Sequence, residues 1–233
     1  MNDYILFIDI KTSDMPKRWN APTTKVEEWP YILQIAWVVC RKSGEEVTRK
    51  DFYVKHKDIP IEDIASRLQG VTPEVLNEKG EERRIVLYTL AADLQLYKPL
   101  IVAHFLEFDK RMLEVGFSRE EIGRNFDDLP KFCTMLQTRK RADFMGSASY
   151  LRLSELYETL VGKPMPNPHN AIAEAEATKE CFFALVARGK ITDQVIAKQK
   201  RGRSRKWELP LSVVIAIAAV VGSSLFLVLQ FLM

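Results

Sequence analysis

The sequence predicts an α/β domain with a mixed sheet, followed by a C-terminal transmembrane helix. Short apolar stretches at 4–12 and 31–40 are typical of buried strands. Later segments, above all 85–97 and the stretch after His169, carry apolar residues at helical spacing. The last stretch, 211–233, contains no charged side chain and is long enough to cross a bilayer.

The first elements are expected to form a sheet. The stretch 4–12 is short and rich in Ile and Phe, which favours a strand buried on both faces. The polar segment 13–30 contains three prolines and is expected to be a long loop. A second strand at 31–40 turns at 43–44 into a third strand around 51–54. Short connections of this kind predict an antiparallel meander.

Helices are expected after the meander. Thr72 and Pro73 suit the N-cap and the first position of a helix. The segment 85–97 has one apolar face and predicts a second helix. A buried strand at 100–103 and a short helix ending near Leu113 follow. Strands and helices in this order predict the α/β class.

The C-terminal segment predicts a membrane anchor. A helix over 211–233 would be about 34 Å long, enough to span the hydrocarbon core. Six basic residues within 198–206 and then Trp207 precede it, which favours a cytoplasmic flank with an interfacial aromatic. We therefore expect a domain at 1–190 in the cytoplasm, a basic juxtamembrane linker at 191–210 and a single-pass anchor. The same basic run could alternatively hold nucleic acid.

Charge and cysteine content narrow the function classes. The net charge of the chain is +3, but outside the basic run the balance is slightly negative. This excludes a bulk basic footprint, so any nucleic acid would be held by a local groove or by the linker. The three cysteines lack metal-ligand spacing, and no signal peptide is visible at the start. Reduced thiols in a cytosolic domain are expected.

Three carboxylates stand at the ends of apolar elements. Asp9 lies two residues before Lys11, so both side chains face the same side of a strand. Glu174 is the single charge on the apolar stripe of the last helix, and Asp109 follows a buried strand. Each is either an ion-pair partner or a metal ligand, since converging carboxylates need a cation between them. His169 would then be placed to accept a proton from an attacking water.

Three sequence segments carry a family resemblance. They read Asp-Ile-Lys-Thr at 9–12, Ala-His-Phe-Leu-Glu-Phe-Asp at 103–109, and His-Asn-Ala-Ile-Ala-Glu-Ala-Glu-Ala-Thr at 169–178. They resemble the Asp-x-Glu-Thr, Ala-His-Asn-x-x-Phe-Asp and His-x-Ala-x-x-Asp-Ala-x-Ala-Thr motifs of the epsilon-type, DEDDh class of 3′–5′ exonucleases. The resemblance extends over about 4–190 of the chain.

The resemblance implies a fold and an activity. It implies a ribonuclease-H-like three-layer fold with a mixed five-stranded sheet, and a hydrolase that releases nucleotides from the 3′ ends of single-stranded nucleic acid. Its cofactor would be Mg²⁺ or Mn²⁺. The roles that the resemblance assigns are metal ligands Asp9, Asp109 and Glu174, general base His169, and substrate-binding residues Thr12 and His104.

The chain departs from the family at four positions. Lys11 stands in place of the motif glutamate, Glu174 in place of aspartate, Asp14 in place of glycine and Phe105 in place of asparagine. An ammonium at a metal-ligand position repels a divalent ion, so two-metal hydrolysis is predicted to be impaired. The sequence thus favours a membrane-tethered protein of the exonuclease family that acts on or binds nucleic acid 3′ ends. The alternative is a catalytically inactive adaptor that binds nucleic acid or a protein partner at the membrane.

Overall fold

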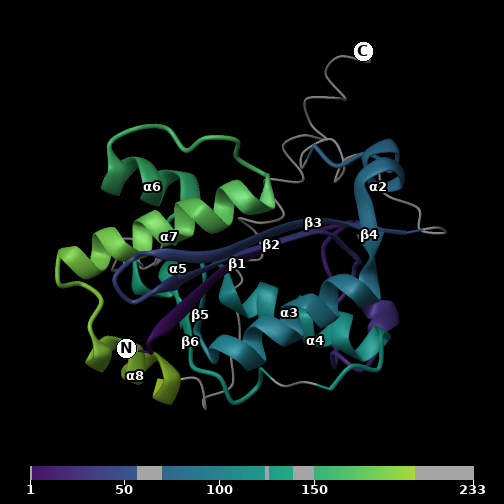
Figure 1. Cartoon of the computed structure of the whole chain (residues 1–233), viewed down its shortest axis with the longest axis horizontal. Coiled ribbons are helices and arrows are strands. Elements are labelled where there is room, and N and C mark those ends of the chain that lie inside the picture. Colours follow the sequence, from purple (N-terminus) through teal and green to yellow (C-terminus); the bar gives the residue numbers. More distant parts are fainter. Residues whose placement is uncertain (1, 57–69, 124–125, 139–149, 203–233) are drawn as a thin grey trace.

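The computed structural model describes residues 2–56, 70–123, 126–138 and 150–202. These ranges form one twisted sheet with helices on both of its faces (Figure 1). The layers of helix, sheet and helix confirm the predicted mixed α/β class. The predicted transmembrane segment 211–233 lies outside the described residues. Within them, none of the helices combines the length and hydropathy that a membrane crossing requires.

The sheet is mixed. Its strands are β1 (Tyr4–Thr12), β2 (Ile32–Arg41), β3 (Glu46–Lys55), β4 (Gly80–Glu82), β5 (Leu100–Ala103) and β6 (Lys131–Cys133). Their order across the sheet is β4-β3-β2-β1-β5-β6. The first three strands pair antiparallel, which confirms the predicted meander. The strand β4 runs parallel to β3, β5 runs parallel to β1, and β6 runs parallel to β5.

The prediction of five strands was wrong, because the described residues form six. Both edge strands, β4 and β6, are only three residues long. The strand β4 has the sequence Gly-Glu-Glu, so no apolar alternation marks it. A side chain at Gly80 would place its Cβ 2.1 Å from the carbonyl oxygen of Leu76. Glycine therefore lets β4 begin directly at the end of the preceding helix.

Seven α-helices lie in the described ranges, together with the 3₁₀ helix η1 (Val26–Glu28). They are α2 (Pro73–Lys79), α3 (Arg83–Tyr97), α4 (Leu106–Arg119), α5 (Thr134–Gln137), α6 (Leu153–Val161), α7 (Ala171–Ala187) and α8 (Asp193–Gly202). The Thr72 hydroxyl accepts a hydrogen bond from the Val75 N–H at 3.3 Å, which confirms the predicted cap. The helix predicted to end near Leu113 instead continues to Arg119, because Val115 and Phe117 are also buried in the core.

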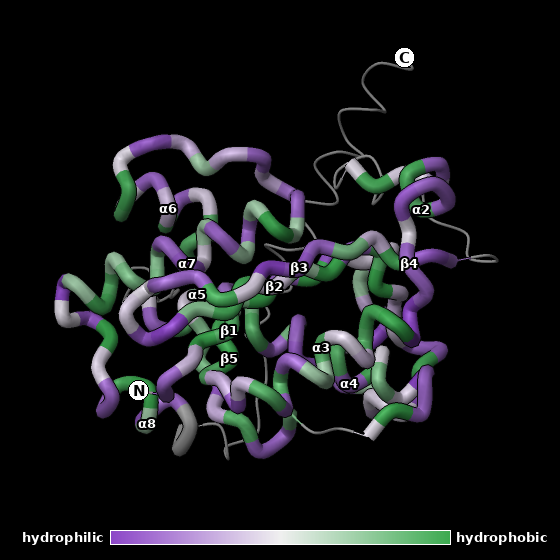
Figure 2. The backbone as a smooth tube through the Cα atoms, viewed as in Figure 1, coloured by the Kyte–Doolittle hydropathy of each residue, from purple (hydrophilic) through white to green (hydrophobic). Residues whose placement is uncertain are grey.

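The strand β1 is buried on both faces, as predicted. Leu6, Ile8 and Ile10 pack into the cluster beneath α3 and α4. On the opposite face Phe7 contacts Phe182 of α7, with ring centroids 5.5 Å apart. Figure 2 shows that hydrophobic segments run along β1 and β5 in the middle of the sheet. The alternation of side chains along one strand therefore supplies both core layers.

The helix α8 lies within the segment predicted to be a linker. The Gln199 side chain accepts a hydrogen bond from the Cys133 N–H and donates one to the Cys133 carbonyl, both at 2.9 Å. This amide thereby pairs with the edge strand β6 as a neighbouring strand would. The boundary at 190 stays a prediction. Cys40, Cys133 and Cys181 are all buried.

Candidate functional site

The predicted site residues come from three elements that meet at one end of β1. Asp9 and Lys11 project from the same face of this strand. Asp109 lies in the first turn of α4, and Glu174 in the first turn of α7. Carboxylates are favoured in the first turn of a helix, where the dipole is positive. We call this group of four side chains the Lys11 cleft.

The Lys11 ammonium lies between two carboxylates. Its Nζ atom is 2.9 Å from Oδ2 of Asp9 and 2.8 Å from Oε2 of Glu174. The three side chains are between 11% and 17% exposed, so these ion pairs are largely shielded from water. An ion pair was one of the two interpretations that the sequence allowed for Asp9 and for Glu174, and in the structure both residues pair with Lys11. A positive charge already occupies the point at which these carboxylates converge.

The charges in the cleft shift one another's pKa values. Burial alone would lower the pKa of Lys11, but the charges of Asp9 and Glu174 outweigh burial and raise it. For Glu174 burial opposes ionisation, yet Lys11 and the His169 N–H lower its pKa overall. Lys11 and Glu174 therefore form a stable buried ion pair at neutral pH.

Asp9 is the less well satisfied carboxylate. Burial raises its pKa to about 8, against the opposing charge of Lys11. Its Oδ2 atom has no hydrogen-bond partner among the described residues, although the ammonium is only 2.9 Å away. The contact with Lys11 is therefore a close charge contact without an aligned N–H.

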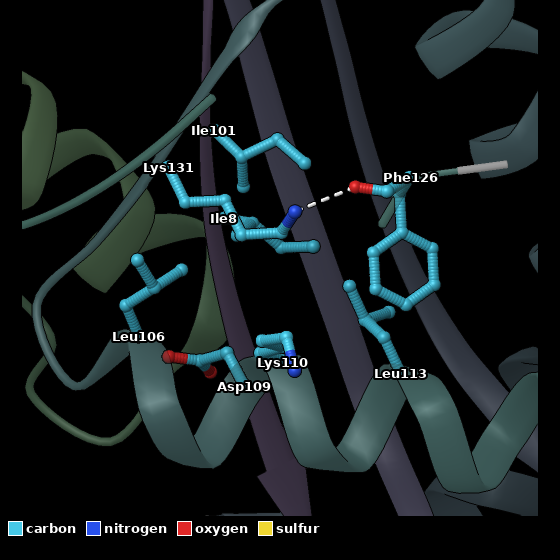
Figure 3. A pocket seen from close by; sticks show the side chains of 8 residues that line it. All are labelled: Ile8, Ile101, Leu106, Asp109, Lys110, Leu113, Phe126 and Lys131. Carbon is cyan, nitrogen blue, oxygen red and sulfur yellow. Dashed lines mark hydrogen bonds between the residues drawn. The ribbon is translucent and has the colours of Figure 1, made fainter. Parts of the chain in front are cut away.

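Asp109 is the most deeply buried acid of the cleft. It projects from α4 among apolar side chains that include Ile8 and Leu106, beside a void of about 10 Å³ (Figure 3). Burial raises its pKa well above the usual value, and the charge of Asp9 adds to this effect. The backbone N–H of Ile10 opposes the shift by donating to it. The neutral form of Asp109 is therefore favoured.

The neighbouring lysines in this view have partners of their own. Lys131 donates to the carbonyl of Phe126 at 2.6 Å, the dashed line in Figure 3. It also donates to the carbonyls of Asp127 and Leu129, each at 2.9 Å, and so closes the loop before β6. Lys110 forms an ion pair with Glu114 one turn further along α4.

His169 lies at the start of α7 with an exposed side chain. Its φ angle is +73°, an uncommon conformation for a residue with a side chain. The N–H of His169 donates to Oε1 of Glu174 at 2.8 Å, which stabilises this conformation. Glu174 thus bridges Lys11 and the backbone of His169. The role of His169 as a general base stays a prediction.

The predicted substrate-binding residues have protein partners. Nε2 of His104 lies 2.9 Å from the Leu151 carbonyl, and Nδ1 lies 3.0 Å from the Thr134 hydroxyl. Burial lowers the pKa of His104, so the ring is neutral and Nε2 donates to the carbonyl. Thr12 donates its hydroxyl to the Asp14 carbonyl at 2.8 Å. Their contacts with a substrate stay predictions.

Gln34, a fully buried residue of β2, supports the site but was not predicted from the sequence to do so. Its amide donates to Asp51 at 2.8 Å, and its oxygen accepts the N–H of Ala171 at 3.1 Å. This bridge fixes the start of α7 to the sheet and so positions Glu174. A polar residue inside an apolar strand was the available signal, since such a group needs partners.

An aromatic group beside the cleft was also missed. The Trp19 ring centroid lies 5.7 Å from that of Phe105 and 5.8 Å from that of Phe108. All three side chains are half-buried. Trp19 belongs to the loop after β1, where no periodic pattern marks its position. Only the fold brings it to the start of α4.

The sheet order β4-β3-β2-β1-β5-β6, with helices on both faces, is the fold that this chain shares with exonuclease I. Solved structures similar to this chain include several of exonuclease I. One, used to explain the processivity of that enzyme, covers 84% of this chain with a TM-score of 0.66 and 16% identity. A zinc-bound complex of E. coli exonuclease I with single-stranded DNA covers 81% with a TM-score of 0.62 and 17% identity.

These comparisons show the fold. This chain covers 43% of the first exonuclease I chain and 41% of the second, so it spans less than half of their length. No protein-family model matches the sequence, and no curated protein matches it.

The residues of the Lys11 cleft do not fit a divalent metal in their present arrangement. Among the described residues, no group of three or more His, Cys, Asp or Glu side chains is placed to hold a metal ion. The ammonium of Lys11 separates Asp9 from Glu174.

Proposed function

We propose that this protein binds the 3′ end of a single-stranded nucleic acid in the Lys11 cleft and has lost two-metal hydrolysis. The observation that carries the proposal is the Lys11 ammonium, 2.9 Å from Asp9 and 2.8 Å from Glu174. In this position the lysine supplies one fixed positive charge where an enzyme of this fold would need divalent ions.

Charge repulsion from Lys11 disfavours a divalent ion in the cleft. A divalent ion about 4.5 Å from the ammonium would be repelled by roughly 7 kcal/mol at an effective dielectric constant near 20. Repulsion of this size corresponds to several powers of ten in metal affinity. Displacing Lys11 would cost free energy, because it would leave Glu174 buried without its partner.

Binding without metal is chemically reasonable at this site. An ammonium has three N–H donors, and its ion pairs with Asp9 and Glu174 engage at most two of them. The third can donate to an oxygen of a terminal nucleotide. E. coli exonuclease I has been solved with a dA16 oligonucleotide and with single-stranded DNA, which supports the choice of ligand.

The test compares binding with cleavage. The full chain would be titrated with a labelled single-stranded oligonucleotide in EDTA, in Mg²⁺ and in Mn²⁺, and the strand length would be followed in parallel. We expect the same Kd in all three buffers and an intact strand. A strand with a 3′-phosphate should have a different Kd from one with a 3′-hydroxyl, because the two strands differ at the terminus that the cleft is proposed to bind.

Two outcomes would contradict the proposal. Stepwise shortening from the 3′ end in Mg²⁺ or Mn²⁺, abolished by His169→Ala, would make the protein an active exonuclease. Absence of oligonucleotide binding in every buffer would leave an adaptor that binds another partner. The Lys11→Glu variant sharpens the test, since it should weaken binding in EDTA and create a dependence on Mg²⁺. Lys190→Glu, an exposed position beyond α7, is the matched control.

We further propose that 211–233 anchors the protein in a membrane with the domain in the cytoplasm. The support is the uncharged stretch itself and the basic run before it. The full chain should stay in the membrane fraction during alkaline carbonate extraction, whereas a chain ending at 210 should not. Protease added to the cytoplasmic side should digest the domain. Release of the full chain by carbonate would contradict the anchor.

A further inference from the structure

A second charged feature lies on the side of the sheet that carries α3 and α4. It is an open groove of about 650 Å³, formed where β3 and β4 end, α3 begins and α4 ends. The charged or titratable side chains that matter for the argument are Lys55, His56, Arg83, Arg84, Arg119 and Glu120. We call it the basic groove. Its volume is within the range of small-molecule and nucleotide sites.

Arg119 forms a fixed part of the groove. Its guanidinium donates to the carbonyls of Val26, Trp29 and Pro30, each at 2.7 Å. The same group lies 3.8 Å from the centroid of the Tyr31 ring. Arg119 is therefore held rigidly by the loop before β2 and contributes charge without being available to a mobile ligand.

Two other cations of the groove form no ion pair with the part of the chain that the structure describes. Arg83 is paired with Glu120. In contrast, Lys55 and Arg84 form no ion pair with any residue that the structure describes, and Arg84 rests over the Tyr88 ring. One further carboxylate, Glu82, lines the groove. Counting these groups, the four cations exceed the two carboxylates.

The positive charges of the groove lower the pKa values of two of its own side chains. Burial lowers the pKa of His56, and the charges of Arg83 and Arg119 lower it further. Burial and Arg83 likewise lower the pKa of Arg119 to about 10. A positive potential in a concave surface attracts phosphate groups.

The groove is connected to the Lys11 cleft through the start of β2. The Ser13 N–H donates to the Tyr31 carbonyl at 2.9 Å, and the Ser13 hydroxyl accepts the Tyr31 N–H at 3.0 Å. Ser13 is two residues beyond Lys11, and Tyr31 lines the groove. Along α4, Asp109 and Arg119 are ten residues apart, or about 15 Å. A strand of several nucleotides can cover this separation.

We propose that the basic groove binds backbone phosphates of the same strand, several nucleotides before the 3′ end held in the Lys11 cleft. Lys55 and Arg84 make the contacts, and Arg119 keeps the groove in shape. This inference rests on the proposed function. It predicts that affinity depends on strand length, because a short strand reaches only the cleft.

The test uses the full chain with single-stranded oligonucleotides of about 3 and about 16 nucleotides. The double variant Lys55→Gln, Arg84→Gln should bind the long strand at least about tenfold more weakly and the short strand unchanged. The dependence of log Kd on log salt for the long strand should become shallower by about 1.4. The control is Lys98→Gln, Lys190→Gln, two exposed lysines outside the groove, which should change neither value.

The outcomes separate this inference from the proposed function. If the wild type binds both strands and the groove variant binds them with the same affinity, the groove does not bind phosphates, whereas the proposed function still holds. Equal losses of affinity for both strands would also contradict this inference, since the effect of the variant would not depend on strand length. If a mononucleotide competes for the groove as effectively as the long strand does, the groove is an independent nucleotide site and this inference is wrong. Absence of any wild-type binding would overturn the proposed function and this inference together.

Discussion

The Lys11 cleft and the basic groove use lysine in opposite ways. Lys11 is 11% exposed and lies within 3 Å of two carboxylates. Lys55 lines an open groove and forms no ion pair with the described residues. The first charge is compensated inside the protein, whereas the second is half-buried at an open groove and is available to a ligand. The comparison shows that a charge that stabilises the fold and a charge that attracts a ligand require different surroundings.

The physical reason is desolvation. A buried ion loses its hydration, so its partners must replace that hydration and removal of one partner leaves the other uncompensated. An exposed charge keeps its hydration and contributes little to stability. The same substitution should therefore affect the free energy of unfolding strongly in the cleft and weakly in the groove.

The largest expected effect is that of Lys11→Met. This change keeps a long side chain but leaves Asp9 and Glu174 without a cation. We expect a loss of about 3 to 5 kcal/mol in the free energy of unfolding near pH 8. Chemical denaturation would measure it. Adding Mg²⁺ should raise the stability of the variant and leave the wild type unchanged.

A double variant provides the control for this prediction. Lys11→Met combined with Glu174→Gln removes both charges of the pair, so part of the lost stability should return. A Lys11→Met protein as stable as the wild type would mean that the contacts of the ammonium do not stabilise the fold.

The second effect is the dependence of stability on pH. The pKa of Asp9 is raised to about 8 in the folded protein from a usual value of 3.8. Between these values the folded state holds a proton that the unfolded state has released, so the free energy of unfolding falls as pH rises. From pH 6 to pH 8 this loss is about 2 kcal/mol for one such group.

Denaturation at both pH values would measure this loss in the wild type and in Asp9→Asn. The variant should show a smaller decrease, because the residue at this position no longer titrates. The raised pKa of Asp109 acts in the same direction and accounts for the part that remains. An increase in wild-type stability from pH 6 to pH 8 would contradict the assigned direction.

A smaller effect is expected for Arg119→Lys at the basic groove. Lysine keeps the charge but cannot match the planar contacts with three carbonyls and the Tyr31 ring. The expected loss is about 1 to 2 kcal/mol in the free energy of unfolding. Arg188→Lys, whose side chain makes one exposed contact with the Leu160 carbonyl, is the matched control. Equal losses in the two variants would show that the contacts of Arg119 stabilise the fold no more than the single contact of Arg188 does.

The smallest effect is that of Lys55→Gln. Because this lysine has no ion-pair partner among the described residues, the free energy of unfolding should change by less than about 0.5 kcal/mol. The same denaturation experiment checks the value. A loss well above 1 kcal/mol would place Lys55 with Lys11 as a structural cation and weaken its role in ligand binding.

Most of the fold could be predicted from local patterns. The short apolar run at β1 predicted a strand buried on both faces, and Thr72 predicted the start of α2 through its cap. The short edge strands β4 and β6 and the last turns of α4 were not located from the sequence. The strand β4 exists because β3 offers a pairing edge, and the last turns of α4 exist because they cover the core.

The motifs singled out acids that the structure brings together, but the contacts of these acids could not be predicted. The motifs pointed to Asp9, Asp109, Glu174 and His169, but each acid had two open interpretations. The aromatic group of Trp19 and the bridge through Gln34 depend on contacts between distant segments. Sequence spacing carries no information about such contacts until the sheet order is known.

The sequence by itself determined the α/β class, the identity of the cleft residues and the replacement of a motif glutamate by Lys11. It did so because side-chain periodicity and residue type are local properties of the chain. Only the tertiary structure decided that the Lys11 ammonium lies between Asp9 and Glu174, and that Lys55 and Arg84 share a groove with Arg119. These are distances between residues far apart in sequence, and packing of the helices on the sheet sets them.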